Sequence, residues 1–246
     1  MPKFSELFQQ FSRRSTILLS PMEWGLGHAS RCIPVLDHLI HQIQARVIVA
    51  ANGPQAALIR AEFPSLPIVP IPSYSIRYRK YRAGTVIRLA FSLPHLARTI
   101  RAENQWLRGF CRDNQVDAII SDNRYGLWHP EIPSYLITHQ LAVKSPLGAW
   151  SEAPVRRQIY RYINRFTACW VPDYPEKDRS MAGDLAHPRQ VPETPVHYIG
   201  PLTRIRPQQA GAPLIIGTTS LHQIQLLVIL SGPEPQRTIL EQRVIH

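Results

Sequence analysis

Short apolar runs and amphipathic segments alternate along most of the chain, and this alternation constrains the fold more than any other feature. The pattern begins with the apolar run Ile17-Leu18-Leu19, a glycine-containing turn, and apolar residues at helical spacing from Ile33 to Ile43. We expect strands at residues 15–20, 45–51, 66–71, 116–121, 134–138, 168–172 and 196–199, and helices at 30–44, 54–62, 86–113 and 152–166. This order favours an α/β fold with a mostly parallel sheet and flanking helices.

The first strand and the first helix are joined by a turn that carries polar residues. In open α/β sheets, ligands bind at the carboxyl edge of the strands, so His28 and Arg31 are predicted to lie where ligands gather. Histidine can take a proton from an alcohol, and it does so best when a carboxylate orients its ring. Asp122 follows another predicted strand and could supply that carboxylate. The alternative is that His28 only contacts the backbone of a tight turn.

Two later strand ends are also rich in polar side chains. Asn123, Arg124 and Tyr125 follow Asp122 directly, and His139-Gln140 follows the next predicted strand. Because parallel strands end at a shared edge, these groups could together hydrogen-bond a hydroxyl-rich or charged ligand. The alternative is a hydrogen-bonded loop in which Asp122 is a structural cap.

The glycines of the first turn give only a weak phosphate-binding signal. Gly25-Leu26-Gly27 is not followed by the third glycine of a dinucleotide-binding motif, because Ser30 occupies its place. The next predicted strand also ends without an acidic residue, so a nicotinamide dinucleotide site is not expected. Arg31, in the first helical turn, could pair with a phosphate or face solvent.

The charge of the chain points to an anionic partner. Lysine and arginine number 28 against 17 acidic residues, which gives a net charge of +11 over 246 residues. A phosphorylated substrate, an anionic membrane surface and nucleic acid all fit this charge, and so does a merely solvated basic surface. The segment 74–82 interleaves tyrosines with cations, which suits stacking on nucleic acid or contact with phospholipid headgroups.

Other features limit the class of protein. A hydrophobic content of 44% indicates a globular chain. The three cysteines are far apart, which fits a reducing, cytoplasmic compartment. The N-terminal residues lack the pattern of a signal peptide, and no apolar run reaches the ~20 residues that a membrane-spanning helix needs.

The C-terminal part of the chain has a different composition. We expect a first domain at residues 1–200, a linker region at 201–224, and the start of a second domain at 225–246. Strands are expected at 214–220 and 225–230, and a helix at 238–244. These elements are too few for an independent domain. Either the chain is a fragment of a longer protein, which the sequence favours, or this segment packs back on the first domain.

Motifs at four places in the chain together resemble GT-B glycosyltransferases of the family 28 type, a group that includes the peptidoglycan lipid-intermediate N-acetylglucosaminyltransferase. WGLGHASRCIP resembles the loop after the first strand, and IISDNRYGL and IPSYLITHQL resemble later strand ends of the amino-terminal domain. YIGPLTR resembles the passage into the second domain, and LLVILSGPEPQR the first strand and loop of that domain. The resemblance implies a Rossmann-like amino-terminal domain that binds the acceptor, followed by the beginning of the donor domain.

The resemblance also implies a chemistry. Such a hexosyltransferase moves a sugar from a nucleotide-sugar co-substrate, usually a UDP-sugar, to an acceptor hydroxyl with inversion and without a metal ion or another cofactor. His28 would be the base and Asp122 its partner. The residues expected to bind the acceptor are Trp24, Gly25, Gly27, Arg31, Asn123, Arg124, Tyr125, His139 and Gln140. Ser231, Gly232 and Arg237 are expected to approach the donor diphosphate.

Several expectations follow from how little of the donor domain is present. The chain alone should be inactive or nearly so. A lipid-linked acceptor and peripheral contact with the inner face of the membrane stay open, whereas a nucleic-acid partner is not expected. The competing interpretations are a sugar-nucleotide epimerase of the same architecture and a basic α/β module that binds anionic lipid or nucleic acid.

Overall fold

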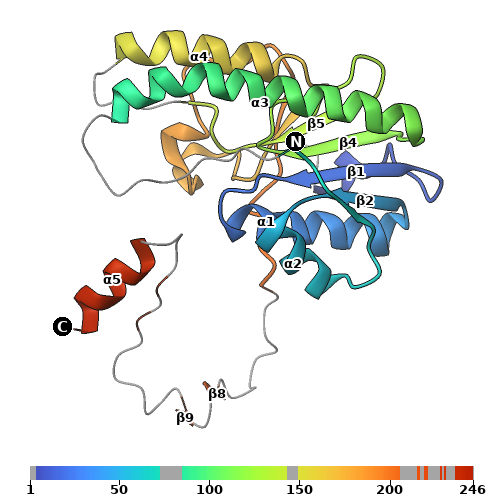
Figure 1. Ribbon diagram of the computed structural model, residues 1–246, viewed down its shortest axis with the longest axis horizontal. Helices are drawn as coiled ribbons and strands as arrows, with labels where there is room; N and C mark the ends of the chain where they lie inside the picture. The colour runs from blue at the N-terminus through green and yellow to red at the C-terminus, as the bar shows by residue number, and fades with distance from the viewer. Residues whose placement is uncertain are drawn as a thin grey trace. The chain divides into compact units, whose positions relative to one another are not determined.

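The computed structural model describes two units of the chain (Figure 1). The described residues are 4–72, 85–142, 149–205, 215–216, 219–220, 228, 230 and 236–245. The first unit holds the described residues up to Arg204, and the second holds those from Ile205 onward.

The first unit is built on a seven-stranded sheet in which every neighbouring pair is parallel. The strands are β1 (Thr16–Pro21), β2 (Arg46–Ala50), β3 (Ile68–Val69), β4 (Ala118–Asp122), β5 (Ser134–Ile137), β6 (Ala168–Val171) and β7 (Val196–Tyr198). Their order in the sheet is β3-β2-β1-β4-β5-β6-β7. The predicted α/β class and parallel sheet are confirmed, although β3 is shorter than the strand expected at 66–71.

This strand order contains a switch point between β1 and β4. The chain first winds outward from β1 to β3 and then returns to place β4 on the other side of β1. Pro21 at the end of β1 lies in register with Asp122 at the end of β4. Ligands of doubly wound sheets bind in the crevice outside such a point, because the loops on its two sides diverge there.

Helices cover both faces of the sheet (Figure 1). One face carries α1 and α2, and the other carries α3 and α4. The α-helices are α1 (Leu26–Asp37), α2 (Gly53–Glu62), α3 (Thr85–Asp113) and α4 (Ala149–Ile163). Shorter helical segments are η1 (Phe4–Phe8), η2 (His38–Ile43), η3 (Lys177–Arg179) and η4 (Gly183–Leu185).

Alternate residues of the central strands enter separate cores on the two faces of the sheet. Ile17 and Leu19 pack with α1 and α2, whereas Leu18 and Ile119 pack with Leu107 of α3. A third cluster lies around Leu136, Cys169 and Ile163 of α4. Because both faces of β1 and β4 are buried, these strands read as continuous apolar runs in the sequence.

The N-terminal segment η1 joins the core although no element was expected there. Phe8 is fully buried, with its ring centroid 5.2 Å from that of Trp170, which in turn stacks on Tyr135 at 4.7 Å. The helix α1 likewise begins at Leu26 instead of Ser30. Gly25, with φ of 76°, makes the turn that precedes it, so the glycine-containing segment is partly helical.

The second unit contains β8 (Ile215–Ile216), β9 (Thr219–Ser220) and α5 (Gln236–Ile245). The prediction of one strand at 214–220 is wrong, because β8 and β9 are two short strands that pair antiparallel. Of the strand expected at 225–230, only Val228 and Leu230 are described, and neither lies in a strand. The helix expected at 238–244 lies within α5.

Candidate functional site

The candidate site lies where β1 and β4 end side by side. The chain leaves β1, turns at Gly25 and enters α1, whose first two turns carry His28 and Arg31 on one side. Asp122 is the last residue of β4 and is fully buried. The switch point therefore places groups from two distant parts of the sequence against each other.

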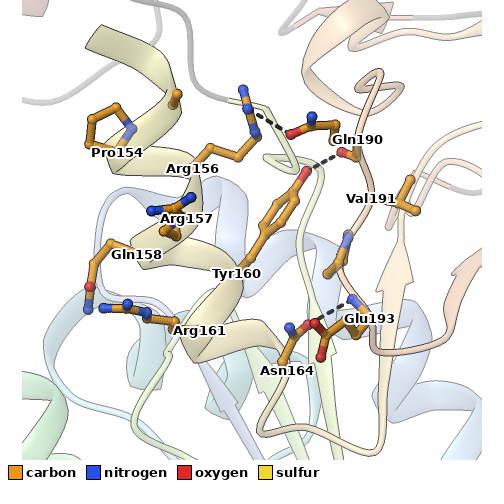
Figure 2. A pocket seen from close by; sticks show the side chains of 12 residues that line it. Pro154, Arg156, Arg157, Gln158, Tyr160, Arg161, Asn164, Gln190, Val191 and Glu193 are labelled. Atoms are coloured by element: carbon orange, nitrogen blue, oxygen red, sulfur yellow. Dashed lines mark hydrogen bonds between the residues drawn. The ribbon is translucent and has the colours of Figure 1, made fainter. Parts of the chain in front are cut away.

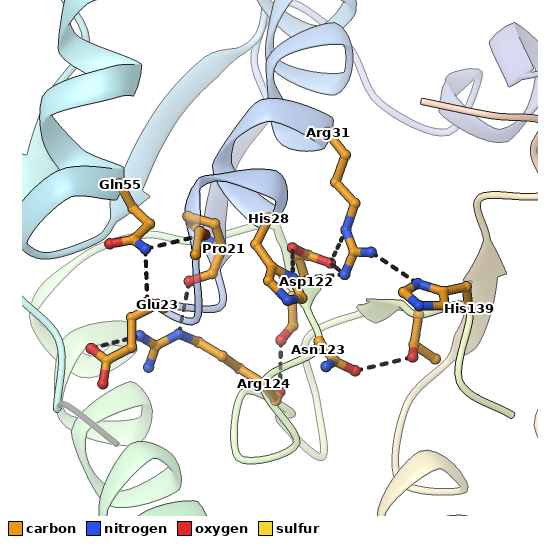
Figure 3. A network of polar contacts seen from close by, with 12 residues as sticks. Pro21, Glu23, His28, Arg31, Gln55, Asp122, Asn123, Arg124 and His139 are labelled. Carbon is orange, nitrogen blue, oxygen red and sulfur yellow. Dashed lines mark hydrogen bonds and ion pairs between the residues drawn. The ribbon is translucent and has the colours of Figure 1, made fainter. Parts of the chain in front are cut away.

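His28, Asp122 and Arg31 form one compact network (Figure 3). His28 Nδ1 lies 2.8 Å from Asp122 Oδ2. Arg31 Nε and Nη2 lie 2.8 Å and 2.5 Å from Asp122 Oδ1. The buried carboxylate thus has a cation on one oxygen and an imidazole on the other, which offsets the cost of removing its charge from water. The expected proximity of His28 and Asp122 is present.

His139, which follows β5, joins this network through Arg31. Arg31 Nη1 lies 3.0 Å from His139 Nδ1, and Nη2 of the same guanidinium lies 2.7 Å from His28 Nδ1. Burial lowers the pKa of His139, and the nearby Arg31 and His28 lower it further. These effects favour a neutral His139 ring near pH 7. Arg31 therefore contacts Asp122 and both histidines. The two predicted positions of Arg31, against a phosphate or facing solvent, do not include these contacts.

Asn123 and Tyr125 lie beside this network and shape the loop after β4. Asn123 has a left-handed backbone with φ of 57°, and its Oδ1 accepts a hydrogen bond from Thr138 Oγ1 at 3.0 Å. The Tyr125 hydroxyl donates to the same Asn123 oxygen at 3.5 Å, and burial raises the pKa of Tyr125. Gln140 is exposed beyond Thr138. The loops after β4 and β5 are therefore tied together at the carboxyl edge.

Arg124, which the sequence predicts to bind the acceptor, is engaged by several protein groups. Its side chain is fully buried, and its guanidinium donates to Glu103 Oε1 at 2.7 Å and to the carbonyl oxygens of Pro21 and Pro72. Glu103, on α3, also accepts from the backbone N–H of Gly126 at 3.1 Å. Arg124 therefore joins β1, α3 and the β4–β5 loop, and its expected role in binding the acceptor stays a prediction.

The loop between β1 and α1 is anchored by Gln55, which the sequence did not single out. Gln55 lies on α2, is buried, and donates from Nε2 to the carbonyl oxygens of Glu23 and Gly25. Trp24 is 37% exposed and the neighbouring Leu26 50% exposed. The anchor thus fixes the backbone next to His28 and leaves apolar side chains at the rim of the site. The sequence around Gln55 gives no indication of this contact, because a polar residue in the first turn of a helix usually faces solvent.

A further buried carboxylate, Asp173, follows β6 by two residues and lies outside the His28 network. Burial by itself would raise the pKa of Asp173, but hydrogen bonds from the Ser180 hydroxyl and from the N–H groups of Met181, Ala182 and Tyr174 outweigh it and lower the pKa to about 2. Asp173 therefore holds the segment that follows β6 in a closed loop.

The residues expected at the donor diphosphate belong to the second unit. Ser231 and Gly232 lie outside the described residues, whereas Arg237 is exposed on α5. Their expected role therefore stays a prediction.

A cavity of about 900 Å³ lies along α4, and none of the residues predicted to form the site lines it (Figure 2). Arg156, Arg157 and Arg161 contribute to its wall, together with residues 190–193. Tyr160 joins the two sides by donating to the carbonyl oxygen of Gln190 at 2.5 Å. The three arginines make this groove suitable for anions, although the Glu193 carboxylate also lines it.

Two further observations concern only the part of the chain that the structure describes. No cluster of three or more histidine, cysteine or acidic side chains in it could hold a metal ion. Its helices include none with the length and apolarity that would let it cross a bilayer.

Comparisons with known proteins give matches at the level of structure. No family model matches the chain, and no curated protein matches it. The glycotransferase of kitacinnamycin has a TM-score of 0.50 and 15% identity, covering 83% of this chain and 55% of the matched one.

Two other matches have lower TM-scores. UGT2 from Phytolacca americana, in a complex with UDP-2fluoro-glucose and pterostilbene, has 0.49 at 14% identity, covering 77% of this chain and 54% of the other. MurG from Acinetobacter baumannii has 0.41 at 13% identity, with coverages of 82% and 48%. The chain spans about half the length of these proteins, and over that half it has a Rossmann-like α/β fold similar to that of the kitacinnamycin glycotransferase.

Proposed function

We propose that this chain is the acceptor-binding half of an inverting glycosyltransferase that transfers a hexosyl group from a UDP-sugar to an acceptor hydroxyl without a metal ion. The observation that carries the proposal is the 2.8 Å contact between His28 Nδ1 and the buried Asp122 carboxylate at the switch point of the sheet. The fold shared with a glycosyltransferase and the sequence motifs support the same class of reaction.

In the proposed reaction, Nε2 of His28 takes the proton of the acceptor hydroxyl. The hydroxyl oxygen forms a bond to the anomeric carbon of the donor while the bond from that carbon to the UDP oxygen breaks, so that UDP leaves with the bonding electrons. The proton remains on His28, and Asp122 stabilises the resulting imidazolium, as carboxylates do in other histidine bases.

The two halves of the protein would bind different substrates, the acceptor and the donor. The rim formed by Trp24, Gly25 and Gly27, together with the loops after β4 and β5, would hold the acceptor. The donor diphosphate would bind mainly to the carboxy-terminal half, with Ser231, Gly232 and Arg237 among its contacts. On this proposal the 246-residue chain alone transfers little or no sugar.

The test uses the protein expressed with the coding sequence that follows His246. UDP release would be measured with UDP-glucose, UDP-galactose and UDP-N-acetylglucosamine, with phenols and alcohols as acceptors. We expect release that resists chelator and falls by roughly 10²- to 10⁴-fold in His28→Ala, the usual contribution of a general base. His41→Ala is the matched control, since His41 is exposed on η2 with its side chain 59% accessible.

The outcomes separate the competing functions. Release that is unchanged in His28→Ala would refute the assignment of the base. Conversion of one UDP-sugar into another without an acceptor would identify an epimerase.

The second candidate is a basic module that binds anionic lipid, and the arginine-lined groove on α4 favours it. It predicts cosedimentation with phosphatidylglycerol vesicles that survives His28→Ala and is lost at high salt.

A further inference from the structure

Arg31 makes several contacts in the site besides its ion pair with Asp122. Its Nε and Nη2 engage Asp122 Oδ1, while its Nη1 reaches His139 Nδ1 at 3.0 Å. Only 13% of its side chain is accessible, so the guanidinium is held in place from several sides. Both imidazoles of the site therefore contact one rigid, planar cation.

A guanidinium can donate hydrogen bonds but cannot accept them. The contact from Arg31 Nη1 therefore requires His139 Nδ1 to be the ring nitrogen without a proton. A doubly protonated ring would turn an N–H group toward the cation, and the lowered pKa of His139 agrees with a neutral ring. The single proton of the neutral imidazole is then on Nε2, so His139 presents an N–H donor.

His28 must adopt the opposite arrangement. Its Nδ1 lies 2.8 Å from Asp122 Oδ2 and 2.7 Å from Arg31 Nη2, and one ring nitrogen cannot donate to the first and accept from the second. Arg31 Nη2 already has Asp122 Oδ1 as an acceptor. If His28 Nδ1 had no proton, its lone pair would face the lone pairs of the buried Asp122 carboxylate without a hydrogen bond between them, which costs free energy. His28 therefore carries its proton on Nδ1 and presents a bare Nε2.

We propose that Arg31 fixes His139 as the Nε2–H tautomer while Asp122 fixes His28 as the Nδ1–H tautomer, so that His139 Nε2–H binds a second oxygen of the acceptor while His28 Nε2 takes the proton of the reacting hydroxyl. This inference rests on the proposed function. It assigns the substrate class as acceptors that carry an oxygen beside the reacting hydroxyl, such as vicinal diols, and it makes Arg31 a positioning residue.

The deciding measurement is a long-range ¹H–¹⁵N NMR spectrum of the histidine rings, which distinguishes protonated from bare nitrogens. It can be recorded on the 246-residue chain near pH 7.5 and does not depend on activity. We expect Nδ1–H for His28 and Nε2–H for His139 in the wild type. In Arg31→Gln, His139 should become a mixture of tautomers, whereas Arg60→Gln, on the exposed side of α2, should leave both rings unchanged.

Kinetics in the longer protein test the role in binding, with UDP-glucose as donor and catechol or phenol as acceptor. Loss of one neutral hydrogen bond predicts a KM for catechol about two- to tenfold higher in His139→Ala, with kcat little changed and phenol hardly affected. His139→Gln, whose amide N–H can replace Nε2–H, should restore the preference for catechol.

The possible results distinguish the two proposals. An Nδ1–H proton on His139, or a His139 tautomer that is unaffected by Arg31→Gln, overturns the inference even if UDP release depends on His28. A catechol preference that persists in His139→Ala overturns the binding role. If the tautomers are as expected but the wild type releases no UDP, the proposed function fails and the arrangement of the rings stands.

Discussion

Replacing Gly126 by alanine should destabilise the protein far more than the same replacement at Gly109. Gly126 follows Arg124 and packs against α3, where an added Cβ would overlap the Ile100 carbonyl oxygen and lie 2.5 Å from Glu103 Cβ. Backbone atoms cannot yield as a flexible side chain can, so α3 or the loop has to move. At Gly109, inside α3, the nearest atom to an added Cβ is 3.9 Å away.

The structure sets the magnitude of this difference. Overpacking costs about 1–3 kcal/mol, and a shift of α3 also weakens the hydrogen bond from the Gly126 N–H to Glu103, worth ~1 kcal/mol. We therefore expect Gly126→Ala to lower the free energy of unfolding by about 2–4 kcal/mol. Gly109→Ala should raise it by about 0.5–1 kcal/mol, because alanine loses less backbone entropy in a helix.

Urea unfolding followed by tryptophan fluorescence measures both effects, since Trp170 is buried in the core. With a slope of roughly 2 kcal/mol per molar urea, the Gly126→Ala midpoint should fall by about 1–2 M. A Gly126→Ala midpoint equal to or above that of Gly109→Ala would refute the claim that the β4–β5 loop packs on α3 without space for a methyl group.

Three further predictions concern groups near the sheet edge. Because the pKa of Asp173 is lowered to about 2 in the folded state, its contribution of roughly 2 kcal/mol is present above pH 4 and lost between pH 4 and 2; acid titrations of stability should show this slope in the wild type and not in Asp173→Asn. Asn123→Ala should cost about 1–2 kcal/mol in urea unfolding through left-handed backbone strain and a lost hydrogen bond, and an unchanged midpoint would contradict this. Burial raises the pKa of all three thiols, to about 11 for Cys111 and about 12 for Cys169 and well above the usual value for Cys32; the half-exposed Cys111 should react first with a thiol reagent at pH 8, and mass spectrometry would show whether a buried cysteine precedes it.

The fold could be predicted from the sequence because local hydrophobic patterns indicate most of its strands and helices. Strands buried on both faces appear as apolar runs, and helices that pack on a sheet have one apolar stripe. Both patterns can be recognised without knowing what the element packs against. The start of α1 was placed four residues late, because Gly25-Leu26-Gly27 reads as a turn although only Gly25 has a positive φ there.

The partners in the site depend on tertiary contacts that no local pattern records. The proximity of His28 and Asp122 could be anticipated because both follow strands of a parallel sheet. From its place in the first helical turn, Arg31 is predicted to meet a phosphate or solvent, because its partner Asp122 lies 91 positions away and no local pattern indicates it. Arg124 is predicted to bind a ligand because it follows Asp122 at a strand end, and the sequence gives no local sign of its buried contact with Glu103 on α3.

The position of β4 beside β1 has a consequence for the chain as it is synthesised. His28 and Asp122 are 94 positions apart, so β1 emerges from the ribosome long before the strand that completes its hydrogen bonds. At roughly 5–20 residues per second, this interval is about 5–20 s. During that time one edge of an apolar strand stays unpaired, a state that invites mispairing. The crevice that holds the histidines thus lies at the strand pair whose two members are synthesised furthest apart in time, and nascent chains halted before Asp122 should be the ones that chaperones retain.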